Sequence, residues 1–299
     1  MIEDKKVIRL NSTKYVLLEL VAVMFFATAG IFVRKSTLTP ANAGIWRMLL
    51  ALPFLFFMGN KYLKDMSKLD IFLAFVSGLC MAGDLALFNI ALVTTSLANT
   101  NLLTNLTALI IVPFSYFIFK EKIPKYYFIG LITAIVGVII LVNGKVNPTP
   151  TNYMGDLFAA LACFFYSFYI LITYRLRDRV NASAILIINA IGAIFGLSIV
   201  AIIQGGLQRP TNIKEFLNLF IYSFCMQMIG QPLFTYCQGK VSVNLSIAIT
   251  LMQPVFAAIY SLIFFNEKLS FVEIIGLIIV IVGVCFCKFQ FDTIKIKEN

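Results

Sequence analysis

The stretch Ser115–Val138, SYFIFKEKIPKYYFIGLITAIVGV, recurs 146 residues later as Ser261–Val284, SLIFFNEKLSFVEIIGLIIVIVGV. The two segments are identical at 12 of 24 positions without a gap. Chance identity between apolar sequences is about one in ten, so the chain contains an internal repeat. The same offset pairs further residues of the two halves, namely Phe88 with Phe234, Ser96 with Ser242 and Thr104 with Thr250.

The composition is that of a membrane protein. The 299 residues are 60% apolar and only 13% charged, and the mean hydropathy is +0.92. A soluble domain of this size cannot bury so much apolar surface, so the chain is expected to be polytopic. The net charge of +10 would suggest nucleic-acid binding in a soluble protein. Here the cations fall in loops and termini, and no nucleic-acid partner is expected.

Ten apolar segments are long enough to cross a hydrocarbon core about 30 Å thick. These expected spans are 15–33, 41–58, 71–93, 96–118, 126–142, 154–174, 182–203, 216–238, 243–265 and 272–288. Five spans fall in each half, and because five is odd, the second half enters the membrane from the opposite side. The sequence therefore predicts an all-α polytopic membrane protein with ten transmembrane helices in two inverted five-helix repeats.

The boundary between the repeats is expected at the linker 143–152, NGKVNPTPTN, because it is rich in Asn, Gly and Pro. The first repeat is then residues 1–145 and the second, inverted repeat is residues 146–299, within one integral membrane unit.

Lysine and arginine residues predict the orientation in the membrane. If the N-terminus lies inside, the inner segments carry 17 of these cations and the outer segments 6, while Arg47 alone falls within a span. This bias predicts that both termini are cytoplasmic, in agreement with an even number of spans. Residues 1–14 are polar without a cleavage-like site, so the first span is expected to be retained.

Several chemistries are disfavoured by what the sequence lacks. There is no histidine, which removes the commonest metal ligand and general base. There is no carboxylate pair and no phosphate loop of the type G-x-x-x-x-G-K-S/T, so an integral-membrane enzyme and a nucleotide-driven pump are both disfavoured. All six cysteines lie in apolar runs and are expected to be buried apolar side chains. No cofactor and no metal are expected.

Two charged residues fall well inside the expected spans, Arg47 in IWRMLLA and Asp84 in CMAGDLALF. A lone charge at mid-membrane costs at least about 2.5 kcal/mol on insertion scales, so each needs a partner or an aqueous cavity. At 1.5 Å per residue, Arg47 lies roughly 9 Å and Asp84 about 10 Å below the same outer boundary. The shared depth fits either a structural ion pair or a substrate or proton site, and both interpretations stay open.

The fourth expected span, SLANTNLLTNLTALIIVPF, is the most polar. Asn101 and Asn105 are four residues apart, so they share one face of a helix. Such side chains either bridge helices or line a cavity, and their number beside an acid and a base favours a cavity wall. Glycines of the fifth and tenth spans recur every seven residues and are expected to allow close helix approach.

The ten spans, the five-span repeats and the motif F-x-E-K followed by G-x6-G resemble the drug/metabolite transporter superfamily, EamA-type branch. The stretch GDLALFNIALVTTSLANTNLLTNLTALI (83–110) is similar to the third and fourth helices of that family, and LMQPVFAAIYSLIFFNEKLS (251–270) also fits. The chain departs from the pattern at Ala108, which stands opposite Pro254, and at Phe25 and Phe26, which stand where the family commonly has tryptophan.

The resemblance implies a secondary carrier of small metabolites, often amino acids, with a central cavity and usually a bacterial inner-membrane location. We therefore expect an exporter or exchanger of a small polar metabolite that works by alternating access in the inner (plasma) membrane. A lipid-carrier flippase or a non-transporting membrane scaffold is the alternative. The expected partners are the small-molecule substrate, the lipid bilayer and either a proton or a counter-substrate, for a monomer or a homodimer. The predicted substrate-binding residues are Asp84, Asn101, Asn105, Arg47, Phe165, Tyr169, Gln231 and Gln253.

Overall fold

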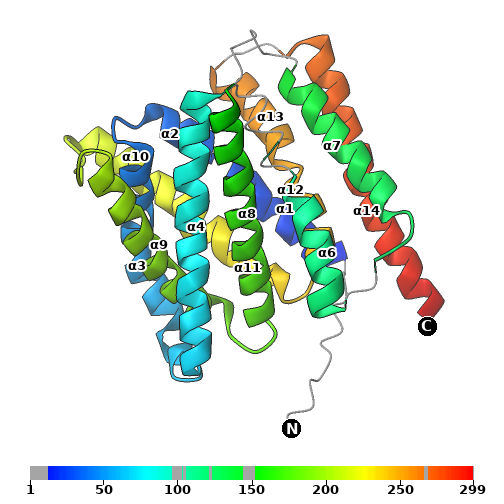
Figure 1. The fold of residues 1–299 in the computed structure, drawn as a ribbon, viewed down its shortest axis with the longest axis horizontal. Coiled ribbons are helices and arrows are strands. Elements are labelled where there is room, and N and C mark those ends of the chain that lie inside the picture. Colours follow the sequence, from blue (N-terminus) through cyan, green and yellow to red (C-terminus); the bar gives the residue numbers. More distant parts are fainter. Residues whose placement is uncertain are drawn as a thin grey trace.

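The computed structural model describes residues 13–95, 103, 106–120, 123–143, 152–265 and 269–298. All regular structure in these ranges is helical (Figure 1). The first half contains α1 (Thr13–Ala27), α2 (Ala29–Lys35), α3 (Pro40–Leu63), α4 (Lys68–Thr94), α6 (Thr107–Phe119) and α7 (Tyr127–Asn143). The second half contains α8 (Tyr153–Leu176), α9 (Ala182–Ile203), α10 (Ile213–Ser223), the π-helical turn η1 (Phe224–Gly230), α11 (Gln231–Gln238), α12 (Val243–Thr250), α13 (Gln253–Phe265) and α14 (Phe271–Glu298).

The all-α membrane fold predicted from the sequence is confirmed. In the described part of the chain, seven helices or helix pairs are long and apolar enough to cross a membrane, and α6 and α7 are shorter apolar helices. A further segment, α10–η1–α11, runs without interruption from Ile213 to Gln238. These ten segments coincide with the ten expected spans, although the span expected at 96–118 is described mainly from α6 onward.

Polar residues fix several of the helix starts. Ser67 and Asp70 form a capping box at the start of α4, in which each side chain accepts a hydrogen bond from the backbone N–H of the other. Asn152, Asn181 and Asn212 cap α8, α9 and α10 through their side-chain oxygens. A cap of this kind stabilises the helix by about 1 kcal/mol. These capping residues therefore determine where the helices begin.

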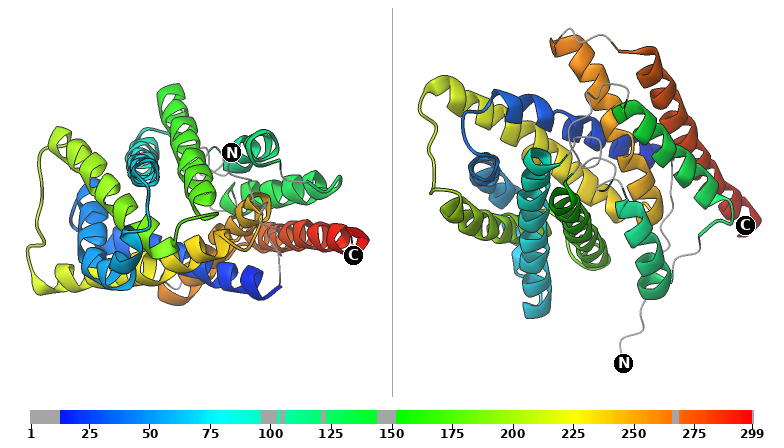
Figure 2. Two further views of the ribbon diagram at one scale, coloured as in Figure 1. Left: turned by 90° about the horizontal axis from the view of Figure 1, so that it is seen from below. Right: turned by 45° about the horizontal axis from the view of Figure 1, so that its top comes forward.

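The helices pack in a pattern that is unchanged when the two halves are exchanged. Three pairs join equivalent spans, α3 with α9, α6 with α12 and α7 with α14. In addition α4 packs on α8, while the counterpart of α4, α10–η1–α11, packs on α1, the counterpart of α8. The left view of Figure 2 shows α4 and α8 on one side of the molecule and α1 and α11 on the other. This pattern fits two repeats related by a pseudo-two-fold axis.

Glycines let α7 and α14 approach closely, and Figure 1 shows the two helices side by side along one end of the molecule. A Cβ atom on Gly276 would lie 2.4 Å from the backbone nitrogen of Leu141, and one on Gly283 would lie 2.5 Å from the backbone nitrogen of Ala134. Neither position has room for a side chain. The close helix approach predicted from the glycine spacing is therefore confirmed.

The expectation that all six cysteines are buried is wrong. Cys163, Cys237 and Cys287 are buried, but Cys80 and Cys225 are partly exposed and Cys285 is exposed. The reason is that a membrane helix turns one face to lipid, where an apolar thiol is as stable as it is in the protein core.

Candidate functional site

Arg47 of α3 lies in the interior of the bundle, with 2% of its surface exposed. Its Nη1 donates a hydrogen bond of 3.1 Å to the hydroxyl of Tyr222, and its Cζ lies 5.3 Å from the centre of the Tyr222 ring. The backbone oxygen of Arg47 accepts a hydrogen bond of 2.7 Å from Ser223 Oγ. Arg47 is thus fixed to α10, in the other repeat, while Nε and Nη2 have no hydrogen-bond partner among the described residues.

Asp84 of α4 lies deep in the bundle, yet protein atoms do not cover it completely. Asp84 interacts electrostatically with Arg47 and with Tyr166 and Tyr169 of α8. No ion pair joins Asp84 to any cation in the described part of the chain. The structure therefore brings the predicted acid and base into one region without pairing them directly.

Two further predicted residues meet at the same place. Gln231, the first residue of α11, donates a hydrogen bond from Nε2 to the hydroxyl of Tyr169. Both side chains are buried. The ring of Tyr169 lies 6.0 Å from the ring of Tyr166, measured between centroids. Together with Arg47 and Asp84, these residues form what we call the central polar cluster: Arg47, Asp84, Tyr166, Tyr169 and Gln231.

Phe165 lies beside this cluster because α4 and α8 pack closely. A Cβ atom on Gly83 would lie 3.0 Å from Cδ1 of Phe165, so the ring lies directly against the backbone that carries Asp84. Phe165 is partly exposed, as the apolar wall of a pocket would be.

The remaining predicted residues belong to the fourth and ninth spans. Asn101 and Asn105 lie outside the described residues. Gln253 is the first residue of α13, directly after an interruption at Leu251 and Met252 between α12 and α13. Since α6 and α13 begin 146 residues apart, at Thr107 and Gln253, the start of this half-helix is repeated in the two halves. Interrupted helices of this kind are typical of transporter substrate sites.

Sequence reasoning missed one charged residue, Glu19 of α1. It is completely buried, and neither carboxyl oxygen has a hydrogen-bond partner among the described residues. The signal was available, because Glu19 is an isolated acid in the apolar run YVLLELVAVMFF. The packing of α1 against the second repeat buries it.

Buried polar atoms without partners are concentrated around the bundle interior. In the described part of the chain, atoms of this kind occur on Glu19, Arg47, Thr173, Asn189, Gln227, Thr235, Gln238 and Ser246. Leaving a polar group unpaired in an apolar interior costs about 1–3 kcal/mol. Groups of this kind are retained where a ligand, an ion or a second conformation supplies the missing bonds.

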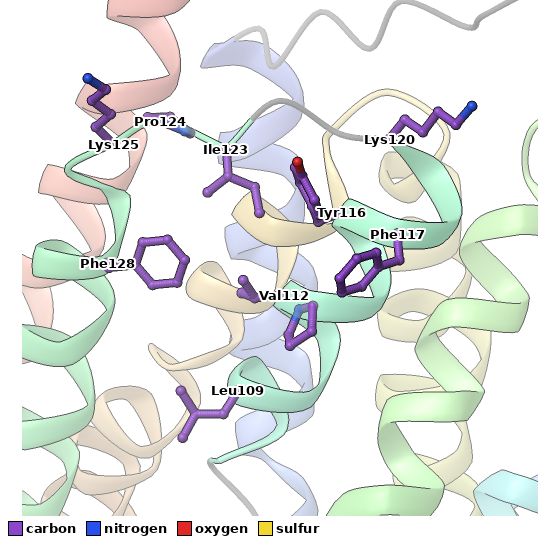
Figure 3. A pocket seen from close by; sticks show the side chains of 10 residues that line it. Leu109, Val112, Tyr116, Phe117, Lys120, Ile123, Pro124, Lys125 and Phe128 are labelled. Atoms are coloured by element: carbon purple, nitrogen blue, oxygen red, sulfur yellow. The ribbon is translucent and has the colours of Figure 1, made fainter.

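A separate groove of about 1060 Å³ lies between α6 and α7 (Figure 3). Its walls are mainly apolar and include Leu109, Phe117 and Phe128, while Lys120 and Lys125 lie at one end. Phe117 is 76% exposed, so this surface meets lipid chains in a bilayer. The groove contains none of the predicted substrate-binding residues.

Comparison with known proteins identifies the family. The sequence profile of the EamA-like transporter family matches the chain twice, at residues 13–143 and at residues 153–288. The chain belongs to this family. As an EamA-like transporter it is a multi-pass membrane protein, and the two matches correspond to its two halves.

Two curated relatives of this EamA-like protein are also transporters. An uncharacterized transporter of Clostridium kluyveri is 23% identical over 220 residues, which cover 71% of this chain and 70% of the relative. The uncharacterized transporter YetK of Bacillus subtilis is 26% identical over 244 residues, covering 79% of this chain and 73% of the relative. A solved structure described as "Crystal structure of protein" superposes with a TM-score of 0.74 at 17% identity, covering 91% of this chain and 95% of the other. That likeness supports the fold alone.

Proposed function

We propose that this EamA-like protein is a secondary transporter, an exporter or exchanger, of a small polar metabolite that carries an amino group, such as an amino acid. It works by alternating access in the inner (plasma) membrane of the cell, and both of its termini are cytoplasmic. The observation that carries the proposal is the position of Asp84, deep in the bundle, partly exposed and without an ion-pair partner among the described residues.

The central polar cluster supports this substrate class. The carboxyl group of Asp84 suits the amino group of a substrate, and the free Nε and Nη2 of Arg47 suit a carboxylate. The aromatic side chain of Phe165 suits an apolar part of the substrate. Asn101 and Asn105 of the fourth span and Gln253 of the ninth span would bind further polar atoms of the substrate. Arg47 of α3 is fixed to Tyr222 of α10, so substrate bound between Arg47 and Asp84 of α4 would join two helices of the first repeat and reach the second repeat through Tyr222.

The experiment is a ligand screen followed by transport. Purified protein in detergent is screened by thermal shift against amino acids, polyamines, nucleosides and sulfonium compounds. A ligand bound only to the folded state at 100 times its Kd stabilises the protein by about 2.7 kcal/mol. Positive ligands are then tested for uptake into proteoliposomes. Asp84→Asn should reduce uptake at least about tenfold, equivalent to a loss of 1.4 kcal/mol, and the protein should remain folded.

The matched control is Asp65→Asn, which removes an exposed acid in the turn before α4 and should transport like the wild type. Wild-type uptake by folded Asp84→Asn would remove Asp84 from the site. If no ligand shifts the melting temperature and none is transported, the proposed substrate class is wrong.

One observation favours a second candidate function, a lipid-carrier flippase. The groove between α6 and α7 is apolar along its length with Lys120 and Lys125 at one end, which suits an acyl chain with an anionic headgroup. Accelerated exchange of fluorescent lipid between the leaflets of proteoliposomes, together with a failed ligand screen, would favour this function over metabolite transport.

A further inference from the structure

The carboxyl group of Glu19 is unexplained by the proposed substrate site. It lies six residues after the start of α1 at Thr13, is completely buried, and has two oxygen atoms without hydrogen-bond partners. Ser246 of α12 lies close enough to act on this carboxyl group, and it is also completely buried with an Oγ that has no hydrogen-bond partner among the described residues. Two unsatisfied polar groups thus face each other where the first helix of one repeat packs on the ninth span.

No cation neutralises Glu19 in the described part of the chain. Among the described side chains, Ser246 acts on Glu19 and no lysine or arginine does. The elements packed against α1 are α2, η1, α11, α12 and α13. Their titratable side chains in the described part of the chain are Lys35, Cys225, Tyr236, Cys237 and Tyr260, and the side chain of Arg34 lies outside that part. Of these, Cys237 interacts with Glu19, as does Tyr166 of α8, and neither is a cation.

We propose that Glu19 is the proton-binding site of the transporter, which makes the coupling ion a proton; this proposal rests on the proposed transport function. An unpaired carboxylate in an apolar interior is penalised by several kcal/mol. A proton taken from water on one side of the membrane forms an O–H bond on Glu19. That O–H can donate to Ser246 Oγ, which removes the charge and satisfies both groups. The same bond breaks on the other side, where the proton returns to water.

The surroundings favour a proton over a sodium ion. Sodium requires several oxygen ligands, whereas a proton requires one acceptor. Ser246 supplies one hydroxyl, and α12 carries no other side chain that acts on Glu19. The carbonyl groups of α12 around Ser246 are engaged in its helix, which begins at Val243 and ends at Thr250.

The structure also connects Glu19 with the central polar cluster. Tyr166 interacts electrostatically with both Glu19 and Asp84, so one side chain is within reach of both acids. α12 ends at the interruption before Gln253, a place where a helix can bend. A movement of α12 away from α1 would separate Ser246 from Glu19 and admit water, while changing the surroundings of Tyr166. Proton release and substrate binding would thereby be coupled.

The first test does not depend on transport. Glu19→Gln keeps the size of the side chain, so folding should be retained, and the melting temperature checks this. We expect the infrared difference spectrum of wild type minus Glu19→Gln, recorded at neutral pH in lipid nanodiscs, to contain the C=O band of a protonated carboxylic acid that shifts in D2O. Asp65→Asn is the exposed control, and the difference spectrum of wild type minus Asp65→Asn should contain the bands of an ionised carboxylate. Carboxylate bands in the Glu19→Gln difference would overturn the proposal.

The second test uses proteoliposomes and a transported amino acid from the screen. A gradient of one pH unit acting on one proton should raise wild-type accumulation up to about tenfold. Glu19→Gln should lose this effect while it still exchanges labelled for unlabelled substrate, and Asp65→Asn should behave as wild type. A gradient effect that persists in Glu19→Gln, or one driven by sodium instead, contradicts the proton site. If wild type transports nothing, the proposed function fails and the infrared test alone decides the role of Glu19.

Discussion

Arg47 of α3 and Tyr222 of α10 are joined by a hydrogen bond of 3.1 Å between Nη1 and the phenol oxygen. The guanidinium also lies over the Tyr222 ring, 5.3 Å from its centre. The buried cation of the first repeat is therefore fixed to the second repeat, and Asp84 stays unpaired among the described residues.

Exchanging the two charges should not restore stability. Because Arg47 and Asp84 form no ion pair, the double variant Arg47→Asp/Asp84→Arg should melt no higher than Arg47→Asp alone. Thermal unfolding in detergent measures this. A double variant that regains half or more of the lost melting temperature would mean that the two charges pair directly.

Removing the phenol oxygen of Tyr222 should destabilise the protein. A hydrogen bond to a charged group contributes about 1.5–3 kcal/mol, so Tyr222→Phe should lower the free energy of unfolding by that amount. The control is Tyr153→Phe at a residue that is 92% exposed, which should leave stability unchanged. Equal stability of the two variants would show that Tyr222 does not hold Arg47.

Adding one methyl group between α7 and α14 should be poorly tolerated. In Gly276→Ala the new Cβ would meet the backbone nitrogen of Leu141 at 2.4 Å, and backbone cannot move aside without separating the helices. We expect a loss of about 1–3 kcal/mol. Gly44→Ala is the matched control, because its Cβ would meet only the end of the Leu197 side chain at 3.0 Å. A smaller effect at Gly276 than at Gly44 would contradict the packing described.

Ser115 of α6 and Asn244 of α12 should show energetic coupling. Asn244 Nδ2 donates a hydrogen bond of 2.8 Å to Ser115 Oγ. Ser115 Oγ in turn can donate to Asn244 Oδ1, at a distance of 3.0 Å. A double-mutant cycle of Ser115→Ala and Asn244→Ala should give a coupling energy of about 0.6–1.7 kcal/mol, as for other hydrogen bonds between membrane helices.

The control cycle combines Asn244→Ala with Thr133→Ala. Among the described residues, the side chain of Thr133 bonds only to Ile129 of its own helix, so the two losses should add. Coupling as large in this control as in the Ser115 cycle would show that the effect is not specific to the hydrogen bond between α6 and α12.

Much of the fold could be predicted from the sequence, because bilayer thickness imposes a length on each apolar run and the backbone must bond within each helix. The repeat of Ser115–Val138 in Ser261–Val284 predicted two equivalent halves, and the odd number of spans in each half predicted that they are inverted. The spacing of Gly276 and Gly283 indicated a close helix contact. The boundary between the two repeats at residues 145 and 146 stays a prediction, as do the roles of Asn101 and Asn105.

The sequence by itself determined the spans, their repetition and the presence of Arg47 and Asp84 inside the membrane. Only the tertiary structure decided which residues meet: Arg47 with Tyr222, Gln231 with Tyr169, and Glu19 with Ser246. Hydropathy reports how far a helix extends through the bilayer. It does not report how each helix is rotated about its axis or which neighbour it faces, since these depend on the packing of side chains from all the spans together.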